Sequence, residues 1–206
     1  MKTIYLLLLG LLAFSHGLFA QRIRSQIGVN VVPLFDKTVE VNASWTNSPN
    51  YDFYFQGGYT FPRHYQKNKN DFEWQYWEGK SSGAYLRVGG RAFLNPNRKF
   101  RMFLGVQLTE SYFKQSGTNY QVIECIVAPC YPLESAAAQK NDRLSAGITG
   151  GFRTNLASRL TLDLGIQANA YVFGKPDLLN NTVYVPGVGR KTVQGVASIQ
   201  YTLKGR

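Results

Sequence analysis

The residue types that most often carry out hydrolytic chemistry are sparse in this sequence. Histidine occurs at His16 and His64, and only His64 lies beyond the apolar N-terminal segment. A serine hydrolase needs a histidine, a serine and an acid within hydrogen-bond reach, and Ser81 and Ser82 are the nearest hydroxyls in the same connection. Because no catalytic motif accompanies them, we interpret His64 as a solvated loop residue. We expect no enzyme, no cofactor and no metal site.

Two cysteines, Cys125 and Cys130, lie close together in the second half of the chain. Cysteines in an oxidising compartment usually pair, although the short loop closed here would make the entropic contribution modest. Two thiols alone bind metal weakly, and no histidine lies nearby. The sequence therefore predicts a disulfide between them.

The segment from 62 to 82 interleaves basic and aromatic side chains. Aromatic faces stack on sugars and basic groups hold anions, so this segment could bind a glycan or a phosphate. An extension of an interfacial aromatic girdle is an equally open interpretation. The candidate binding residues are Arg63, Lys67, Lys69, Trp74, Trp77 and Lys80.

A third set consists of charged residues on the polar sides of segments that alternate between apolar and polar positions. Its members are Arg24, Glu40, Asp52, Arg87, Arg91, Arg101, Arg143, Arg153 and Asp163. If those segments enclose an interior, the charges must pair there, and we expect a structural ion-pair network that plugs the lumen. Because the arginines outnumber the acids, a gated anion path is the open alternative.

The elements that must position these residues are β-strands. Every even position from Leu160 to Val172 is aliphatic, whereas the odd positions up to Tyr171 carry Thr, Asp, Gly, Gln, Asn and Tyr. A strand places two such sets on opposite faces, whereas a helix would scatter them around its circumference. The same test predicts eight strands, at 23–34, 38–45, 51–61, 83–94, 100–112, 143–154, 160–173 and 192–203.

The predicted connections alternate in length. Short turns rich in Asn, Pro and Ser occupy 46–50, 95–98 and 155–158, and long connections occupy 62–82, 115–142 and 174–191, with 35–37 as the short exception. Short turns on one side, long loops on the other and an even strand count are typical of transmembrane barrels. Both termini then lie on the short-turn side.

Alternation alone is also compatible with a soluble, lipocalin-like barrel, which has its apolar face inside. Two features favour a membrane barrel: the polar face holds few charges, and aromatic residues gather toward the strand ends, as in interfacial girdles. These aromatics are Phe53, Phe61, Phe100, Tyr112, Phe152, Phe173 and Tyr201. The fold class is therefore all-β, a single eight-stranded antiparallel up-and-down transmembrane barrel.

The N-terminal segment differs from the rest of the chain. Lys2, the apolar run from Ile4 to Phe14 and the small-residue exit at Ala20 match a secretory signal peptide, so residues 1–20 are predicted to be removed and residues 21–206 to form the barrel domain. The net charge of +11 falls to +10 when Lys2 is lost. In an exported protein this charge favours lipid phosphates or acidic glycans as partners and excludes nucleic acid.

Residues 21–206 resemble the small eight-stranded outer-membrane barrels of the OmpX and OmpA-core type. Gln21 directly after the expected cleavage point, QIGVNVVPLF at 26–35 and LDLGIQANAYVFG at 162–174 are similar to porin-family barrels of Bacteroidota. The resemblance implies a bacterial outer membrane, lipopolysaccharide as a neighbour, the barrel-insertion machinery during biogenesis, and a structural or surface-interaction role. Surface glycans or proteins are further possible partners. A narrow pore for small solutes, a lipid A-modifying barrel enzyme and a soluble periplasmic carrier are the alternatives.

Overall fold

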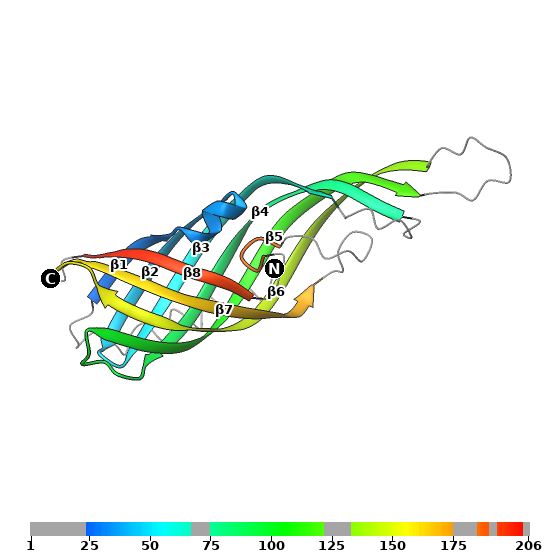
Figure 1. Ribbon diagram of the computed structural model, residues 1–206. Coiled ribbons are helices and arrows are strands. Elements are labelled where there is room, and N and C mark those ends of the chain that lie inside the picture. Colours follow the sequence, from blue (N-terminus) through cyan, green and yellow to red (C-terminus); the bar gives the residue numbers. More distant parts are fainter. Residues whose placement is uncertain (1–23, 67–74, 122–132, 175–184, 190–192, 204–206) are drawn as a thin grey trace.

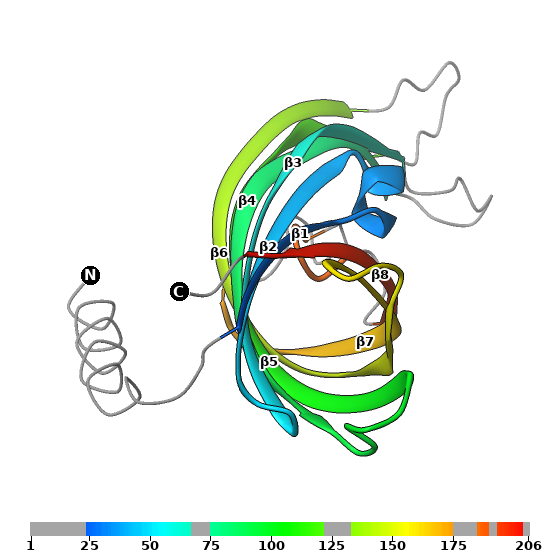
Figure 2. The same ribbon diagram turned by 90° about the vertical axis from the view of Figure 1, so that its left-hand side faces the viewer.

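The computed structural model describes residues 24–66, 75–121, 133–174, 185–189 and 193–203. Eight antiparallel strands form a closed barrel in which each strand pairs with its sequence neighbours and β1 pairs with β8 (Figures 1 and 2). The strands are β1 (Arg24–Asn30), β2 (Thr38–Ser48), β3 (Tyr51–Gln66), β4 (Gln75–Phe93), β5 (Phe100–Gln121), β6 (Leu133–Asn155), β7 (Leu160–Gly174) and β8 (Val193–Thr202). The predicted all-β fold and strand count are confirmed.

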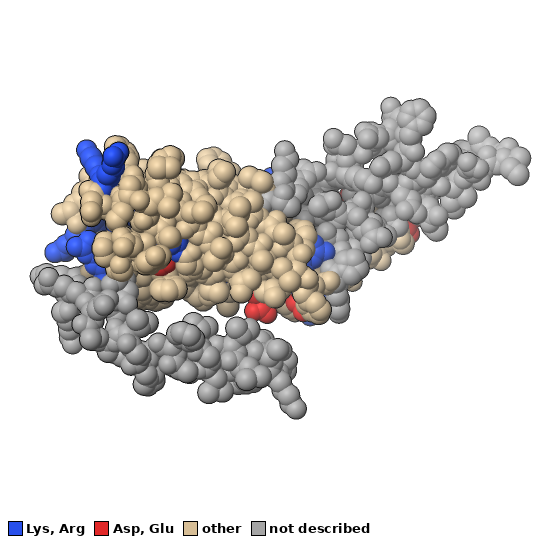
Figure 3. Space-filling view, turned by 90° about the horizontal axis from the view of Figure 1, so that it is seen from below, with Lys and Arg blue, Asp and Glu red and all other residues tan. Residues whose placement is uncertain are grey.

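The barrel wall has an apolar outside and a polar inside. Outward residues such as Val106 and Ile166 are 67% and 63% exposed, whereas their inward neighbours Gln107 and Gln167 are both 4% exposed. Most of the described wall between its two ends is free of charged side chains in the space-filling view (Figure 3). This distribution reverses the usual pattern, in which polar side chains face solvent and apolar ones fill the interior.

The register of the strands brings charged residues together across hairpins. Asp52 on β3 stands directly opposite Arg91 on β4, and Arg153 on β6 stands opposite Asp163 on β7. Residues directly opposite in an antiparallel pair share a face, so both pairs point inward together. The short turns of the barrel lie at this end, where the backbone of Leu203 also donates a hydrogen bond to that of Ser25.

The long connections contain more strand than the sequence pattern predicts. β3 and β4 extend into the predicted loop at 62–82, and β5 and β6 extend into the predicted loop at 115–142. These extensions project from one end of the barrel (Figure 1). Backbone pairing continues there, as in Ser116 opposite Ala138 and Thr118 opposite Ala136, but small and polar residues replace the apolar ones. The extensions are not part of the apolar wall, so their residues do not alternate between apolar and polar types, although backbone hydrogen bonds still join the strands.

The first two strands also differ from their predicted limits. Residues Val32–Asp36 form a 3-10 helix, η1, because Pro33 has no backbone N–H for a ladder and a fixed φ suited to a helix start. Lys37 ends η1 in the left-handed region at φ 54°. β2 continues to Ser48 through an irregularity after Thr46, so the predicted turn at 46–50 shrinks to Pro49 and Asn50. No helix in the described ranges is long and apolar enough to span a membrane.

Candidate functional site

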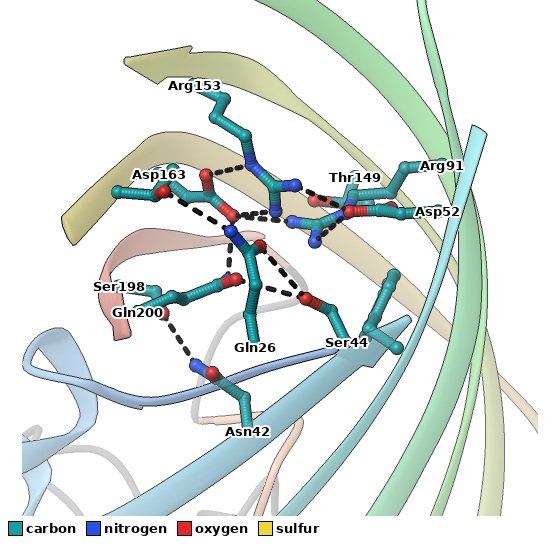
Figure 4. Close-up of polar contacts among 12 residues, drawn as sticks. Gln26, Asn42, Ser44, Asp52, Arg91, Thr149, Arg153, Asp163, Ser198 and Gln200 are labelled. Atoms are coloured by element: carbon teal, nitrogen blue, oxygen red, sulfur yellow. Dashed lines mark hydrogen bonds and ion pairs between the residues drawn. The ribbon is translucent and has the colours of Figure 1, made fainter. Parts of the chain in front are cut away.

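Four charged side chains from four strands form a closed cluster inside the barrel, toward the short-turn end (Figure 4). We call it the Arg–Asp cluster; its members are Asp52, Arg91, Arg153 and Asp163. Arg91 binds Asp52 through two hydrogen bonds of 2.8 Å, and Arg153 binds Asp163 through two of 2.6 Å. Each of these pairs has the bidentate geometry that gives guanidinium–carboxylate contacts their strength.

Two further contacts join these pairs across the lumen. Arg91 Nη1 lies 2.8 Å from Asp163 Oδ2, and Arg153 Nη1 lies 2.8 Å from Asp52 Oδ2. Each arginine therefore contacts both aspartates, and the formal charges of the cluster sum to zero. None of the four residues is more than 7% exposed. The cluster links β3 and β4 to β6 and β7, so its side chains occupy the lumen at this level.

Aromatic and amide side chains surround the Arg–Asp cluster. The guanidinium of Arg91 lies 4.8 Å from the ring centroid of Tyr54 and 5.0 Å from that of Phe103. Gln200 Nε2 donates a 2.9 Å hydrogen bond to Asp163 Oδ2. Stacking on ring faces and donation to the carboxylates satisfy groups that burial would otherwise leave without partners.

A polar chain around Gln200 continues from the cluster toward β1 and β2. Ser44 Oγ lies 3.1 Å from Gln200 Oε1, and Gln26 Nε2 lies 3.3 Å from Thr161 Oγ1. Asn42 Nδ2 donates to Ser198 Oγ at 2.6 Å, beside this chain (Figure 4). At the level of the Arg–Asp cluster, the inward side chains of β1 and β2 are therefore joined by neutral hydrogen bonds, which complement the charged cluster on the opposite strands.

A second charged group lies nearer the extended-hairpin end, centred on Arg87 and Glu40. Arg87 Nη1 is 3.4 Å from Glu40 Oε2 and 2.7 Å from Gln56 Oε1, and Arg87 Nε donates to Thr109 Oγ1 at 3.0 Å. Tyr85 donates its hydroxyl hydrogen to Glu40. Arg87 and Glu40 are each no more than 2% exposed, so this ion pair is also fully desolvated.

The connection between β7 and β8 sends a short turn back into the barrel. We call Val185–Gly189 the inserted turn. Val185 and Val188 are 0% and 1% exposed and pack with Phe113. The carbonyl oxygen of Pro186 accepts a 2.7 Å hydrogen bond from Ser111 Oγ, and that of Gly187 accepts one from Arg87 Nη2.

The inserted turn lies within the predicted loop at 174–191 and was not predicted as a separate element. A signal was nonetheless present, since VPGVG combines Pro-Gly turn chemistry with two valines that a solvated loop does not need. Gly187 and Gly189 adopt φ of +76° and +85°, a region that favours glycine. Which way such a turn folds depends on the surrounding barrel, and the local sequence does not encode it.

Three members of the predicted lumen set, Arg24, Arg101 and Arg143, lie outside these clusters. Arg24 is exposed at the start of β1, and Arg101 is half-buried at the same end, 5.0 Å above the ring centroid of Phe93. Neither has an ion-pair partner in the part of the chain that the structure describes. Arg24 and Arg101 occupy inward positions at the rim of the barrel, where water rather than a carboxylate can solvate their charges. Arg143 is buried and lies over the rings of Phe113 and Tyr171.

The predicted basic and aromatic segment is only partly within the described ranges. Arg63 forms an ion pair with Asp36 of η1, and Lys80 is exposed on β4. Trp77 belongs to β4, opposite Asn119. Lys67, Lys69 and Trp74 lie outside the described residues, as do Cys125, Cys130 and the predicted signal peptide at 1–20. The disulfide and the signal peptide remain predictions.

His64 is exposed near the end of β3 and stands opposite Lys80 in the register. Ser81, one of the two serines considered as its partner, is 1% exposed and belongs to the set of β4 residues that points into the barrel. The His64 ring makes no hydrogen bond to another described residue. Within the described ranges, no group of three or more His, Cys, Asp and Glu residues is arranged to hold a metal ion.

Comparison with known proteins adds little to this description. No protein-family model and no curated protein matches the chain. The structure is similar to the crystal structure of CarO2 from Acinetobacter baumannii, with a TM-score of 0.41, 7% identity, and coverage of 89% of this chain and 98% of that one. It is also similar to Neisserial surface protein A, with a TM-score of 0.31, 13% identity, and coverage of 87% and 91%. Likeness at this level does not bear on function, and the fold assignment depends on the barrel itself.

We expect Asp163→Asn to destabilise the barrel by about 3–5 kcal/mol, because it leaves Arg91 and Arg153 buried with one carboxylate between them. The free energy of unfolding in urea, measured in detergent micelles or vesicles, tests this. Asp142→Asn, at an exposed position on β6, is the matched control and should change stability little. Equal effects of the two substitutions would contradict the role given to the Arg–Asp cluster.

We expect the inserted turn to be protected from reagents in solution. In a chain with Cys125 and Cys130 replaced by alanine, Val188→Cys should react slowly with a charged maleimide. Adding Gly187→Ala should speed the reaction roughly tenfold or more, because a Cβ there meets the Tyr85 ring and the bond from Arg87 is lost. Ala138→Cys, exposed on β6, is the control and should label quickly in both backgrounds. Rapid labelling of Val188→Cys alone would contradict the buried position.

Proposed function

We propose that this protein is an integral protein of a bacterial outer membrane, with a closed lumen and a structural or surface-interaction role. The observation that carries the proposal is the wall itself, which presents apolar side chains outward on all eight strands while its charged and amide groups are buried inside. In water such a wall would expose a continuous apolar surface far larger than soluble monomers tolerate. In a membrane, lipid acyl chains cover this surface, so the free-energy cost of exposing it to water is removed.

The dimensions of the apolar wall support a membrane position. On β5 the outward positions run Phe100, Met102, Leu104, Val106 and Leu108 before the first acid, Glu110. At about 3.4 Å per residue and a tilt of about 40°, this stretch matches the apolar band of about 25 Å of outer-membrane barrels. Closure of the barrel satisfies the backbone hydrogen bonds of every strand edge, which is required within lipid.

The lumen supports a role other than transport. The Arg–Asp cluster fills it toward the short-turn end, and the inserted turn with Arg87 and Glu40 fills it toward the other. The described strands of the β3–β4 and β5–β6 hairpins extend beyond the barrel and offer surface for contacts there (Figure 1). We infer that the hairpins, rather than the lumen, provide the interactions of the protein, with surface glycans, proteins or lipopolysaccharide as candidate partners.

The narrow-pore alternative rests on a specific observation. The inserted turn is held by hydrogen bonds to Ser111 and Arg87 and by the packing of two valines, contacts that a loop could exchange for solvent. The Arg–Asp cluster would still obstruct the path at its own level. A lipid A-modifying activity has less support, because His64 has neither serine nor acid within hydrogen-bond distance among the described residues.

We expect the folded protein to behave as a membrane barrel in gel electrophoresis. Unboiled samples of the outer-membrane fraction in SDS should migrate differently from boiled ones, because a closed strand ladder resists the detergent until it is heated. Recovery in the soluble periplasm without a mobility shift would contradict the proposal and favour a soluble carrier.

We expect the wild-type protein to be silent in a planar lipid bilayer. Gly187→Ala alone should also be silent, because the Arg–Asp cluster still fills the lumen. Adding Asp52→Ala and Arg91→Ala removes the bidentate pair between them and both contacts across the lumen, while Arg153 and Asp163 keep their bidentate contact. This triple variant should conduct. Conductance by the wild-type protein would establish the pore alternative instead.

A further inference from the structure

The apolar wall of β4, β5 and β6 ends at a group of lysines on the outward face. Lys114 follows Tyr112 on β5, Lys140 lies beyond Leu144 on β6, and Lys80 lies beyond Leu86 on β4. All three lysine side chains are exposed, and none forms an ion pair within the described part of the chain. Charged residues of both signs are visible at this end of the wall in Figure 3.

The register places these three lysines side by side. Lys114 stands directly opposite Lys140, and Lys80 stands opposite Ser116, two positions beyond Lys114. Directly opposed residues have Cβ atoms about 4.5–5.5 Å apart, and diagonal neighbours about 7–8 Å apart. Like charges in direct opposition destabilise a strand pair, and an anion bound between them would offset the repulsion.

The other charges on this face restrict where an anion can bind. Glu110 and Asp142 lie on the wall side of the lysines, and Asp142 stands opposite Tyr112. His64 lies on the other side, opposite Lys80. An anion therefore finds the most positive potential between the lysines themselves, because Glu110 and Asp142 repel it on the wall side and Glu78 repels it beyond Lys80.

Two hollows flank the lysines on this outward face. The one nearer the wall, about 500 Å³, is lined mainly by apolar groups, including Gly57, Ala84, Leu86 and Tyr112, and also by Glu110 and Asp142. The one beyond the lysines, about 830 Å³ and open, is lined by His64, Glu78, Lys80, Ser116, Thr118 and small residues such as Ala136 and Ala138. The first is suited to a hydrocarbon chain and the second, with its small and polar lining, to a sugar ring.

We propose that this face binds a phosphorylated glycolipid of the outer leaflet. Its phosphate lies between Lys114 and Lys140 with Lys80 beside it, an acyl chain occupies the apolar hollow, and its sugar occupies the open one. The proposal rests on the membrane position proposed above, which places the edge of the apolar wall at the level of lipid headgroups. A free phosphate would use the lysines alone and leave both hollows empty.

The test is lipid selection by the full chain in nanodiscs of phosphatidylcholine that contain a small fraction of lipid A. We expect native mass spectrometry to show lipid A retained by the wild-type protein. The double variant Lys114→Gln/Lys140→Gln should retain roughly 10- to 30-fold less, since each basic residue near a lipid surface contributes about a factor of five in affinity. The matched control is Arg98→Gln/Lys99→Gln, which removes two charges at the short-turn end and should retain lipid A normally.

Any of the following results would overturn the proposal. Equal retention of lipid A by the double variant and the wild type, or equal retention of dephosphorylated and phosphorylated lipid A, would show that the lysines do not hold a phosphate. Displacement of lipid A by millimolar inorganic phosphate would make free phosphate the ligand. Failure of the wild-type chain to enter nanodiscs would overturn the proposed membrane position as well, whereas entry without lipid selection would overturn this inference alone.

A second readout separates binding from folding. In lipid-free detergent, we expect Lys114→Gln/Lys140→Gln to be at least as resistant to urea as the wild type, because the substitution removes a repulsive pair. In the presence of lipid A, the wild type should become the more resistant of the two. A double variant that is less stable without lipid would show that the lysine pair is structural.

Discussion

Pairing of buried charge is the constraint on which the barrel interior depends. An eight-stranded barrel is just wide enough to be filled by its own side chains, so the groups that point inward must satisfy one another. Asp52 and Asp163 are each contacted by both guanidinium groups, which supply the partners that burial would otherwise remove. The contacts between Arg91 and Asp163 and between Arg153 and Asp52 exist only when the barrel is closed, so they report on closure itself.

This constraint explains the register of the wall. Because a shift of one residue turns every side chain to the other face, a slip between β6 and β7 would place Asp163 in the apolar environment outside. The cost of an unpaired charge in that environment exceeds any gain from altered packing. The buried ion pairs therefore specify the alignment of strands whose outward residues are interchangeable aliphatic side chains. Ion pairs of this kind contribute more to uniqueness than to net stability.

The features that could be predicted are those encoded within a short stretch of sequence, whereas features that depend on contacts between distant segments could not be predicted. Period-two alternation is local, and it located all eight strands; the pairing of Arg153 with Asp163 also follows locally, from a short turn. The contacts across the lumen depend on how far the strands are staggered around the barrel, which no local pattern encodes. The hairpin extensions were missed because backbone pairing there carries no apolar alternation. The inserted turn was missed because two valines in a loop do not specify what they pack against.

The outer surface contains charges of the same sign that face each other. Every inward acid of the described barrel has a guanidinium partner, whereas Lys114 and Lys140 are opposed to each other on the outside. Exposure to water makes such a pair tolerable, since the repulsion is weak where the dielectric constant is high. At the edge of an apolar wall the dielectric constant falls, and the repulsion rises accordingly. The barrel pairs every inward acid that the structure describes, whereas these lysines lie at the level where a membrane would supply anionic headgroups. This position distinguishes them from the solvated cations at the short-turn end.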